Sequence, residues 1–292
     1  MKCIVLLAIL GAAVGMLNII KPVFSSNCSA NNLFKYMSSI LSAKPTQRIV
    51  NGEEATPNEF PHIASLQVGI FGLFWSHSCG GILISPNYVL TAAHCVDGQS
   101  ASNLRVELGK HNLDATESNQ QRITISQVIM NPGYDSNAAG YPNDIAVLRL
   151  SSPANLVTGF VETIELSPDD SYDGVSVILA GWGKLRGSDS GVSKLLQKVS
   201  MPVISQSACT SEWAGVSGAA VLETHICAFD PSFGTSACNG DSGGPMYCPN
   251  GSGGINVCGV TSWGESGCGG TKPSVYGRVS KFVNWIRDNT DL

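Results

Sequence analysis

The stretch Cys238-Asn239-Gly240-Asp241-Ser242-Gly243-Gly244-Pro245 decides how the rest of the sequence is interpreted. A single serine lies in it among three glycines, and glycine adopts backbone angles that other residues resist. The glycines therefore permit a tight turn whose backbone N–H groups converge on an oxyanion, which makes Ser242 a candidate nucleophile. A serine hydroxyl needs a neighbouring base, and that base needs a group to orient it.

Both partners of such a serine are found upstream. His94 lies in Leu90-Thr91-Ala92-Ala93-His94-Cys95, and an imidazole with a pKa of roughly 6.5 is suited to general-base work near neutral pH. Asp144 stands at the head of the apolar run 145–150, where an unpaired carboxylate would be expensive. The alternatives are a core histidine beside a disulfide and a turn or cap aspartate.

Three motifs follow one another in the order His, Asp, Ser: TAAHC, NDIAVLRL and GDSGGP. In this order and spacing they resemble the trypsin and chymotrypsin family of serine endopeptidases, and the resemblance covers Ile49 to Leu292. It implies that His94, Asp144 and Ser242 are catalytic and act through an acyl-enzyme. It also implies that the backbone amides of Gly240 and Ser242 donate to the oxyanion.

The alternation of short apolar runs with turn residues predicts an all-β fold. The chain has 292 residues, of which 43% are hydrophobic and only 13% are charged, as suits a globular protein. Short apolar runs separated by turn residues indicate strands at 63–68, 81–84, 104–108, 123–129, 145–150, 175–180, 197–202, 225–228, 245–248, 257–263 and 274–279. We expect two packed antiparallel six-stranded β-barrels, at about 49–155 and 156–280, and a short C-terminal helix at about 280–289 that begins at Ser280 as its cap.

The first 25 residues are predicted to be a signal peptide, because Met1-Lys2 is followed by an apolar run from Ile4 to Ile20. The alternative is a membrane anchor, but this run is at the lower limit of length for spanning a bilayer. The point of cleavage is left open between Ala13 with Gly15 and Val23 with Ser25.

Residues 26–48 resemble an activation propeptide, and residues 49–292 form the protease domain. In the family, cleavage after the basic residue, here Arg48, frees the amine of Ile49, which pairs with the aspartate before the serine, here Asp241. An unpaired buried carboxylate would cost several kcal/mol, so the pair is suited to be a switch. The resemblance therefore predicts a secreted, extracellular zymogen.

The residues of the specificity pocket depart from trypsin at one place. Ser236 stands where trypsin-like enzymes have an aspartate, so the charge that holds lysine or arginine is missing. Ser262, Trp263 and Gly264 match the strand that pairs with the substrate backbone, Gly264 leaves the pocket mouth open, and Ser274 should narrow the pocket. The set resembles chymotrypsins and broader elastases. We expect a preference for Phe, Tyr, Leu or Met before the scissile bond, with small apolar residues as the alternative.

Ten cysteines in a chain that opens with an apolar leader indicate an oxidising compartment and disulfides, with metal binding as the competing interpretation. No C-x-x-C motif occurs. The resemblance implies three bridges, Cys79–Cys95, Cys209–Cys227 and Cys238–Cys268. For Cys248 and Cys258 we propose a bridge across the hairpin between them, which leaves Cys28 as the odd cysteine once Cys3 departs with the signal.

The loop 108–121 corresponds to the calcium loop of trypsins, but Lys110 and Gln120 stand where calcium-binding relatives have carboxylates. We therefore expect no calcium, no other metal and no cofactor. Asn27 and Asn250 lie in N-x-S sequons, which permit glycosylation without proving it.

Charge limits the class of partner. Residues 1–48 contain five basic residues and no acidic one, which leaves 12 basic against 22 acidic residues in the mature part. This acidic balance without a basic cluster argues against nucleic acid. The resemblance implies protein or peptide substrates, an activating trypsin-like protease, protein inhibitors, no membrane and a monomer. The rival hypothesis is a catalytically silent relative that uses the fold for binding.

Overall fold

The computed structural model describes residues 52–70 and 74–292, all within one compact unit, Gln47–Leu292. The predicted signal peptide, propeptide, Arg48 and Ile49 lie outside the described residues. Among the helices that are described, none has the length and apolar composition needed to cross a bilayer.

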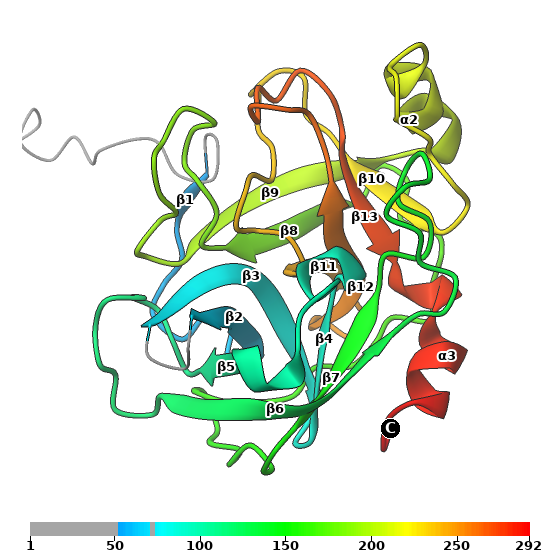
Figure 1. Cartoon of the computed structure of the whole chain (residues 1–292). Helices are drawn as coiled ribbons and strands as arrows, with labels where there is room; N and C mark the ends of the chain where they lie inside the picture. The colour runs from blue at the N-terminus through cyan, green and yellow to red at the C-terminus, as the bar shows by residue number, and fades with distance from the viewer. Residues whose placement is uncertain (1–51, 71–73) are drawn as a thin grey trace, which may run out of the picture. The chain divides into compact units, whose positions relative to one another are not determined.

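Six strands form a closed antiparallel barrel in the N-terminal part of this unit (Figure 1). Each strand pairs with the next in the order β2, β3, β4, β7, β6, β5, and β5 closes the ring on β2. The strands are β2 Ile63–Ile70, β3 Phe74–Ser85, β4 Tyr88–Thr91, β5 Leu104–Leu108, β6 Gln121–Met130 and β7 Ala146–Leu150. Closure leaves no unpaired sheet edge and fills the interior with side chains.

A second ring of six strands follows along the chain. Its order is β9, β10, β13, β12, β11, β8, and pairing between β8 and β9 closes it. The strands are β8 Ser176–Gly181, β9 Gln197–Ile204, β10 His225–Ala228, β11 Pro245–Pro249, β12 Ile255–Trp263 and β13 Ser274–Arg278, and the short β1 Glu53–Glu54 adds to the edge of β9. The expectation of an all-β fold with two six-stranded barrels is confirmed.

Alternation of side chains explains why these segments are strands. In β9 the side chains of Val199, Met201 and Val203 are buried while Ser200 between them is exposed, which is the period of a half-buried strand. The two barrels share a hydrophobic core, in which the ring of Phe60 stacks on Tyr247 of β11 with centroids 5.1 Å apart.

The helices are short. The C-terminal helix is confirmed as α3 Val283–Asp288, which follows the 3₁₀ turn η3 Val279–Lys281. The expected cap was wrong: Ser280 lies inside η3 and its hydroxyl bonds Asp170, while the N-cap position of α3 is Phe282, which provides no side-chain hydrogen bond. A second helix, α2 Gln206–Trp213, was not predicted, although Ser205 caps it by accepting a hydrogen bond from the Ala208 amide at 3.2 Å.

Candidate active site

Ser242 lies in a turn that leads directly into β11. Gly240 and Gly243 have φ values of +101° and +73°, which favour glycine. A Cβ on Gly243 would lie 2.2 Å from Oγ1 of Thr91 and 2.7 Å from the Gly80 carbonyl oxygen, so no other residue fits there. The sequence GDSGG is thus required by the conformation that exposes Ser242.

The amides of this turn fall into two groups. Those of Asp241, Gly243 and Gly244 donate to carbonyl oxygens at 2.8 to 2.9 Å. Those of Gly240 and Ser242 donate to no carbonyl or side chain in the described part of the chain. Two free N–H groups flanking a serine are available to an oxygen that gains negative charge.

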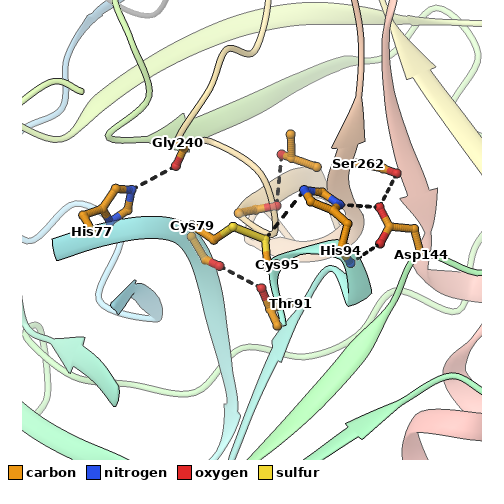
Figure 2. The surroundings of a disulfide bond; sticks show 11 residues. His77, Cys79, Thr91, His94, Cys95, Asp144, Gly240 and Ser262 are labelled. Carbon is orange, nitrogen blue, oxygen red and sulfur yellow. Dashed lines mark hydrogen bonds and ion pairs between the residues drawn. A yellow bond between two sulfur atoms is a disulfide. The ribbon is translucent and has the colours of Figure 1, made fainter. Parts of the chain in front are cut away.

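A disulfide places the turn beside His94. Cys79 of β3 is bonded to Cys95, and the short helix η1 Ala93–Cys95 carries His94 (Figure 2). Gly80, which follows Cys79, donates its amide to the Ser242 carbonyl at 2.8 Å. The disulfide and this hydrogen bond therefore connect the Ser242 turn of one barrel to the His94 turn of the other.

His94 and Asp144 form a two-point contact. The backbone amide of His94 donates to Oδ1 of Asp144 at 2.8 Å, and its Nδ1 donates to Oδ2 at 2.7 Å. Because a carboxylate only accepts hydrogen bonds, Nδ1 carries a proton, and in the neutral imidazole Nε2 is then the acceptor. The Ser262 hydroxyl of β12 also donates to Oδ2, at 2.6 Å, so this oxygen accepts from both Ser262 and the His94 ring (Figure 2).

The Asp144 carboxylate is buried, with only 2% of the residue exposed. Burial alone would raise the pKa of Asp144, but the hydrogen bond and the charge of His94, together with the Ser262 hydroxyl, outweigh it and hold this pKa below its ordinary value. The carboxylate therefore stays ionised and can hold the imidazole in one orientation.

The histidine and the serine are not joined by a hydrogen bond among the described residues. Nε2 of His94 instead lies 3.7 Å from the Cys95 sulfur. Ser242 is half-buried and lines the cavity described below. Contacts between a nucleophile and its base are often long without a substrate and shorten in the complex.

A cavity of about 240 Å³ opens beside Ser242. It is lined by two segments of chain, 237–239 and 261–268, which include Ser262, Trp263 and Gly264. Ser236 and Ser274 are buried behind this lining: the Ser236 hydroxyl donates to the Cys268 carbonyl at 3.2 Å, and the Ser274 hydroxyl accepts from the Ala237 amide at 3.1 Å. Glu265 is the one carboxylate among the described lining residues, and both of its oxygens accept hydrogen bonds from Thr271.

Asp241 is buried behind the turn, with 4% of the residue exposed. Its carboxylate accepts the amides of Gly183 at 2.8 Å and Cys238 at 3.0 Å. Burial raises the pKa of Asp241 to about 6, although these two hydrogen bonds act in the opposite direction. The predicted partner, the Ile49 amine, lies outside the described residues.

His77 was not singled out in the sequence, yet it contacts the same turn. Its Nε2 donates to the Gly240 carbonyl at 2.9 Å, and its Nδ1 accepts from the Ser65 hydroxyl at 2.8 Å. Burial lowers the pKa of His77 to about 4, which keeps the ring neutral. Ser262 was assigned only to the substrate strand, and its bond to Asp144 was missed. Neither residue stands in a motif that marks such a contact.

The described residues contain four disulfides, Cys79–Cys95, Cys209–Cys227, Cys238–Cys268 and Cys248–Cys258. Cys238–Cys268 ties the serine turn to the far rim of the cavity. In the described residues one group of three metal-ligand types converges, Cys79, His94 and Cys95, but its two sulfurs are bonded to each other and offer no thiolate.

The loop that corresponds to a calcium site contains an internal cation. The ammonium of Lys110 is fully buried and donates to the Ala115 carbonyl and to Oε1 of Gln120 at 3.1 Å. It lies 3.9 Å from a Glu107 oxygen and 3.8 Å from a Glu117 oxygen. The Lys110 ammonium thus occupies the interior of this loop and already uses the oxygens that a bound metal cation would need as ligands.

Comparison with known proteins places this geometry in context. The sequence model of the family described as Trypsin matches residues 49–286. A protein named fibrinolytic enzyme, isozyme C, from Lumbricus rubellus is 41% identical over 248 residues, which cover 83% of this chain and 100% of that protein. A chymotrypsin-like serine proteinase from Haliotis rufescens is 39% identical, with coverage of 89% and 99%, and a trypsin from Sus scrofa is 37% identical, with coverage of 82% and 94%.

Proposed function

Because the chain belongs to the trypsin family of serine endopeptidases, we propose that Ser242 is its nucleophile, His94 its general base and Asp144 the group that orients the base. The observation that carries this proposal is the buried Asp144 carboxylate, which accepts both the Nδ1 and the backbone amide of His94. In that arrangement Nε2 is the acceptor nitrogen of the neutral imidazole, and it lies near the Cys79–Cys95 bridge. Gly80, next to this bridge, is hydrogen-bonded to the carbonyl of Ser242.

The reaction follows from these positions. The Ser242 oxygen attacks the scissile carbonyl carbon while Nε2 of His94 takes the hydroxyl proton. The carbonyl oxygen becomes an anion and accepts the unused amides of Gly240 and Ser242. The C–N bond then breaks, His94 returns its proton to the leaving amine, and water releases the acyl group by the same steps in reverse order.

The primary specificity that we propose is for large or medium apolar side chains, namely Phe, Tyr, Leu and Met. The support is the cavity of about 240 Å³ next to Ser242, with the neutral Ser236 and Ser274 behind its wall. Apolar pockets discriminate by size, at about 1 to 3 kcal/mol for a methylene group, so the preference should be graded. Small apolar residues remain the competing outcome, because Ser274 is larger than glycine.

The chain is further proposed to be a secreted monomeric zymogen, activated by a trypsin-like protease that cuts after Arg48. The freed Ile49 amine would reach Asp241, whose buried carboxylate forms no ion pair with a described residue. The four disulfides support an oxidising, extracellular location.

The test is turnover of matched peptides after cleavage of the purified proform at Arg48. Peptides differ only in the residue before the scissile bond, which is Phe, Leu, Ala or Arg. The proposal predicts the highest kcat/KM for Phe or Leu. A preference for Ala would indicate elastase-like specificity, a preference for Arg would refute the pocket assignment, and no turnover after verified cleavage would favour the binding relative.

A further inference from the structure

The tip of the β11–β12 hairpin carries an acceptor sequence for N-glycosylation, Asn250-Gly251-Ser252. Of the two N-x-S sequons in the sequence, the other is at Asn27, before the proposed activation cleavage. Asn250 would therefore be the only such acceptor that stays in the protease domain, and the geometry of the tip shows whether a sugar fits there.

The Asn250 side chain is held by its oxygen. Oδ1 accepts the amides of Ser252 at 3.2 Å and Gly254 at 2.9 Å, and the Ser252 hydroxyl at 2.8 Å. Nδ2 donates one hydrogen bond, to Oδ1 of Asn256 at 3.1 Å. A carboxamide nitrogen has two N–H groups, and the second has no acceptor among the described residues. Replacing that hydrogen by a sugar would keep every hydrogen bond of the turn.

Space is available around this nitrogen. Gly251, Ser252 and Gly253 are exposed, and a Cβ added to either glycine would meet nothing within 4 Å. Asn250 and Asn256 also line a hollow of about 830 Å³, larger than the cavity beside Ser242. Its other walls mix apolar and charged side chains, which include Leu166, Pro168, Tyr172, Glu165, Asp169 and Arg287.

We propose that Asn250 carries an N-linked glycan and that the first sugar of this glycan rests in the hollow. A sugar ring offers C–H faces to Leu166, Pro168 and Tyr172 and hydroxyls to the charged side chains, so both kinds of wall residue gain a partner. In the reaction, Nδ2 forms a bond to C1 of a lipid-linked oligosaccharide, the C1–O bond to the pyrophosphate breaks, and Nδ2 loses one proton while the lipid pyrophosphate leaves.

The attachment site lies at the other end of β12 from the catalytic cleft. Asn256 lies at the start of β12 and Trp263 at its end, and a strand rises roughly 3.3 Å per residue, so the two ends are about 23 Å apart. Hydrolysis of short peptides should therefore be the same with and without the glycan.

The first experiment expresses the full chain through a eukaryotic secretory pathway and maps glycans by mass spectrometry. This inference rests on the secretion that forms part of the proposed function, so recovery of the chain from the culture medium is checked first, independently of catalysis. A mass on the Asn250 peptide that peptide N-glycosidase removes is expected. It should be lost in Ser252→Ala and retained in Ser252→Thr, which keeps the hydroxyl. An unmodified Asn250 would overturn the proposal, whatever the state of Asn27 and whatever the activity.

A second experiment tests the place of the first sugar. One sample keeps only that sugar after endoglycosidase treatment, and a second loses the whole glycan to peptide N-glycosidase, with Asn250→Asp as its matched control. Hydrogen exchange of segment 163–172 should be slow in the first sample and severalfold faster in the second and in the control. Equal exchange in the three samples would refute contact between the sugar and the hollow.

Discussion

The buried carboxylate of Asp241 makes the stability of the uncut chain depend on pH. Its two hydrogen bonds, from the amides of Gly183 and Cys238, do not offset the loss of water, and burial raises its pKa to about 6 from an ordinary value of 3.8. In an acid whose pKa is raised by folding, the folded state binds the proton more tightly. Its contribution to stability is complete below about pH 4 and is lost as the pH rises through about 6.

The size of this effect follows from the shift. A change of roughly two pKa units corresponds to about 3 kcal/mol, because each unit is worth about 1.4 kcal/mol. The free energy of unfolding of the uncut chain should therefore fall by about 3 kcal/mol between pH 4 and pH 7 through Asp241 alone. Asp241→Asn removes the titrating group and should remove this part of the slope. After cleavage, the Ile49 amine would neutralise the carboxylate and flatten the slope in the wild-type chain.

The assay is urea unfolding from pH 4 to pH 7, in a Ser242→Ala background that prevents self-digestion. Uncut samples also carry Arg48→Gln, and cleaved samples keep Arg48. The difference between wild type and Asp241→Asn should change by about 3 kcal/mol across this range when uncut, and by much less when cleaved. Parallel pH profiles for the two uncut proteins would refute a buried, unpaired Asp241. Equal slopes in the cut and uncut wild-type chains would refute its pairing with Ile49.

Three further predictions follow from single contacts. Ser262→Ala removes a hydrogen bond to the ionised carboxylate of Asp144. The value of kcat should therefore fall by about 10- to 100-fold, equivalent to roughly 1.5 to 3 kcal/mol, with little change in KM. An unchanged kcat in steady-state assays would contradict this role of Ser262. Ser236→Asp should shift kcat/KM in matched peptides towards Arg before the scissile bond, and an unaltered Phe-to-Arg ratio would place Ser236 outside the pocket. Lys110→Met removes the cation that Glu107 and Glu117 share, but Glu107 keeps Arg105 and Arg122, so the change should cost about 1.5 to 3 kcal/mol in urea unfolding. Added calcium should not stabilise the wild-type chain, and stabilisation by calcium would contradict the assignment of this loop.

The sequence was most informative where a local pattern determines a structure. The strands at 104–108 and 225–228 were predicted with the bounds that β5 and β10 have, and for the first of them the turn residues Asn103 and Gly109 mark both ends. The strand β4, Tyr88–Thr91, was not among the predicted strands; it pairs with β3 on one side and with β7 on the other. Short strands of this kind depend on tertiary contacts.

The residues of the candidate site also fall into those that a local motif marks and those that only tertiary contacts reveal. Ser242, His94 and Asp144 stand in motifs, so each could be named in advance. Ser262 and His77 could not be assigned their contacts, because both depend on the packing of one barrel against the other: Ser262 comes from β12 to reach Asp144, and His77 from β3 to reach Gly240. Contacts between residues 118 and 163 positions apart leave no trace in local sequence.

The loop 109–121 was predicted only in part from the sequence. The replacement of carboxylates by Lys110 and Gln120 is visible in the sequence and predicts that calcium is not bound. That the Lys110 ammonium is fully buried, and bonds Gln120 itself, is visible only in the structure. The sequence thus indicated what was missing from the loop, and the fold shows what takes its place.

The most direct test of the central claim is to trap the acyl group on the nucleophile. The chain cleaved after Arg48 is mixed with a p-nitrophenyl ester at mildly acidic pH, quenched and digested, and the acylated peptide is identified by mass spectrometry. The account predicts one acyl group per molecule, on Ser242, and none in His94→Ala under the same conditions. Acylation at another residue, or none in a correctly cleaved and folded chain, would contradict the assignment of Ser242 as the nucleophile.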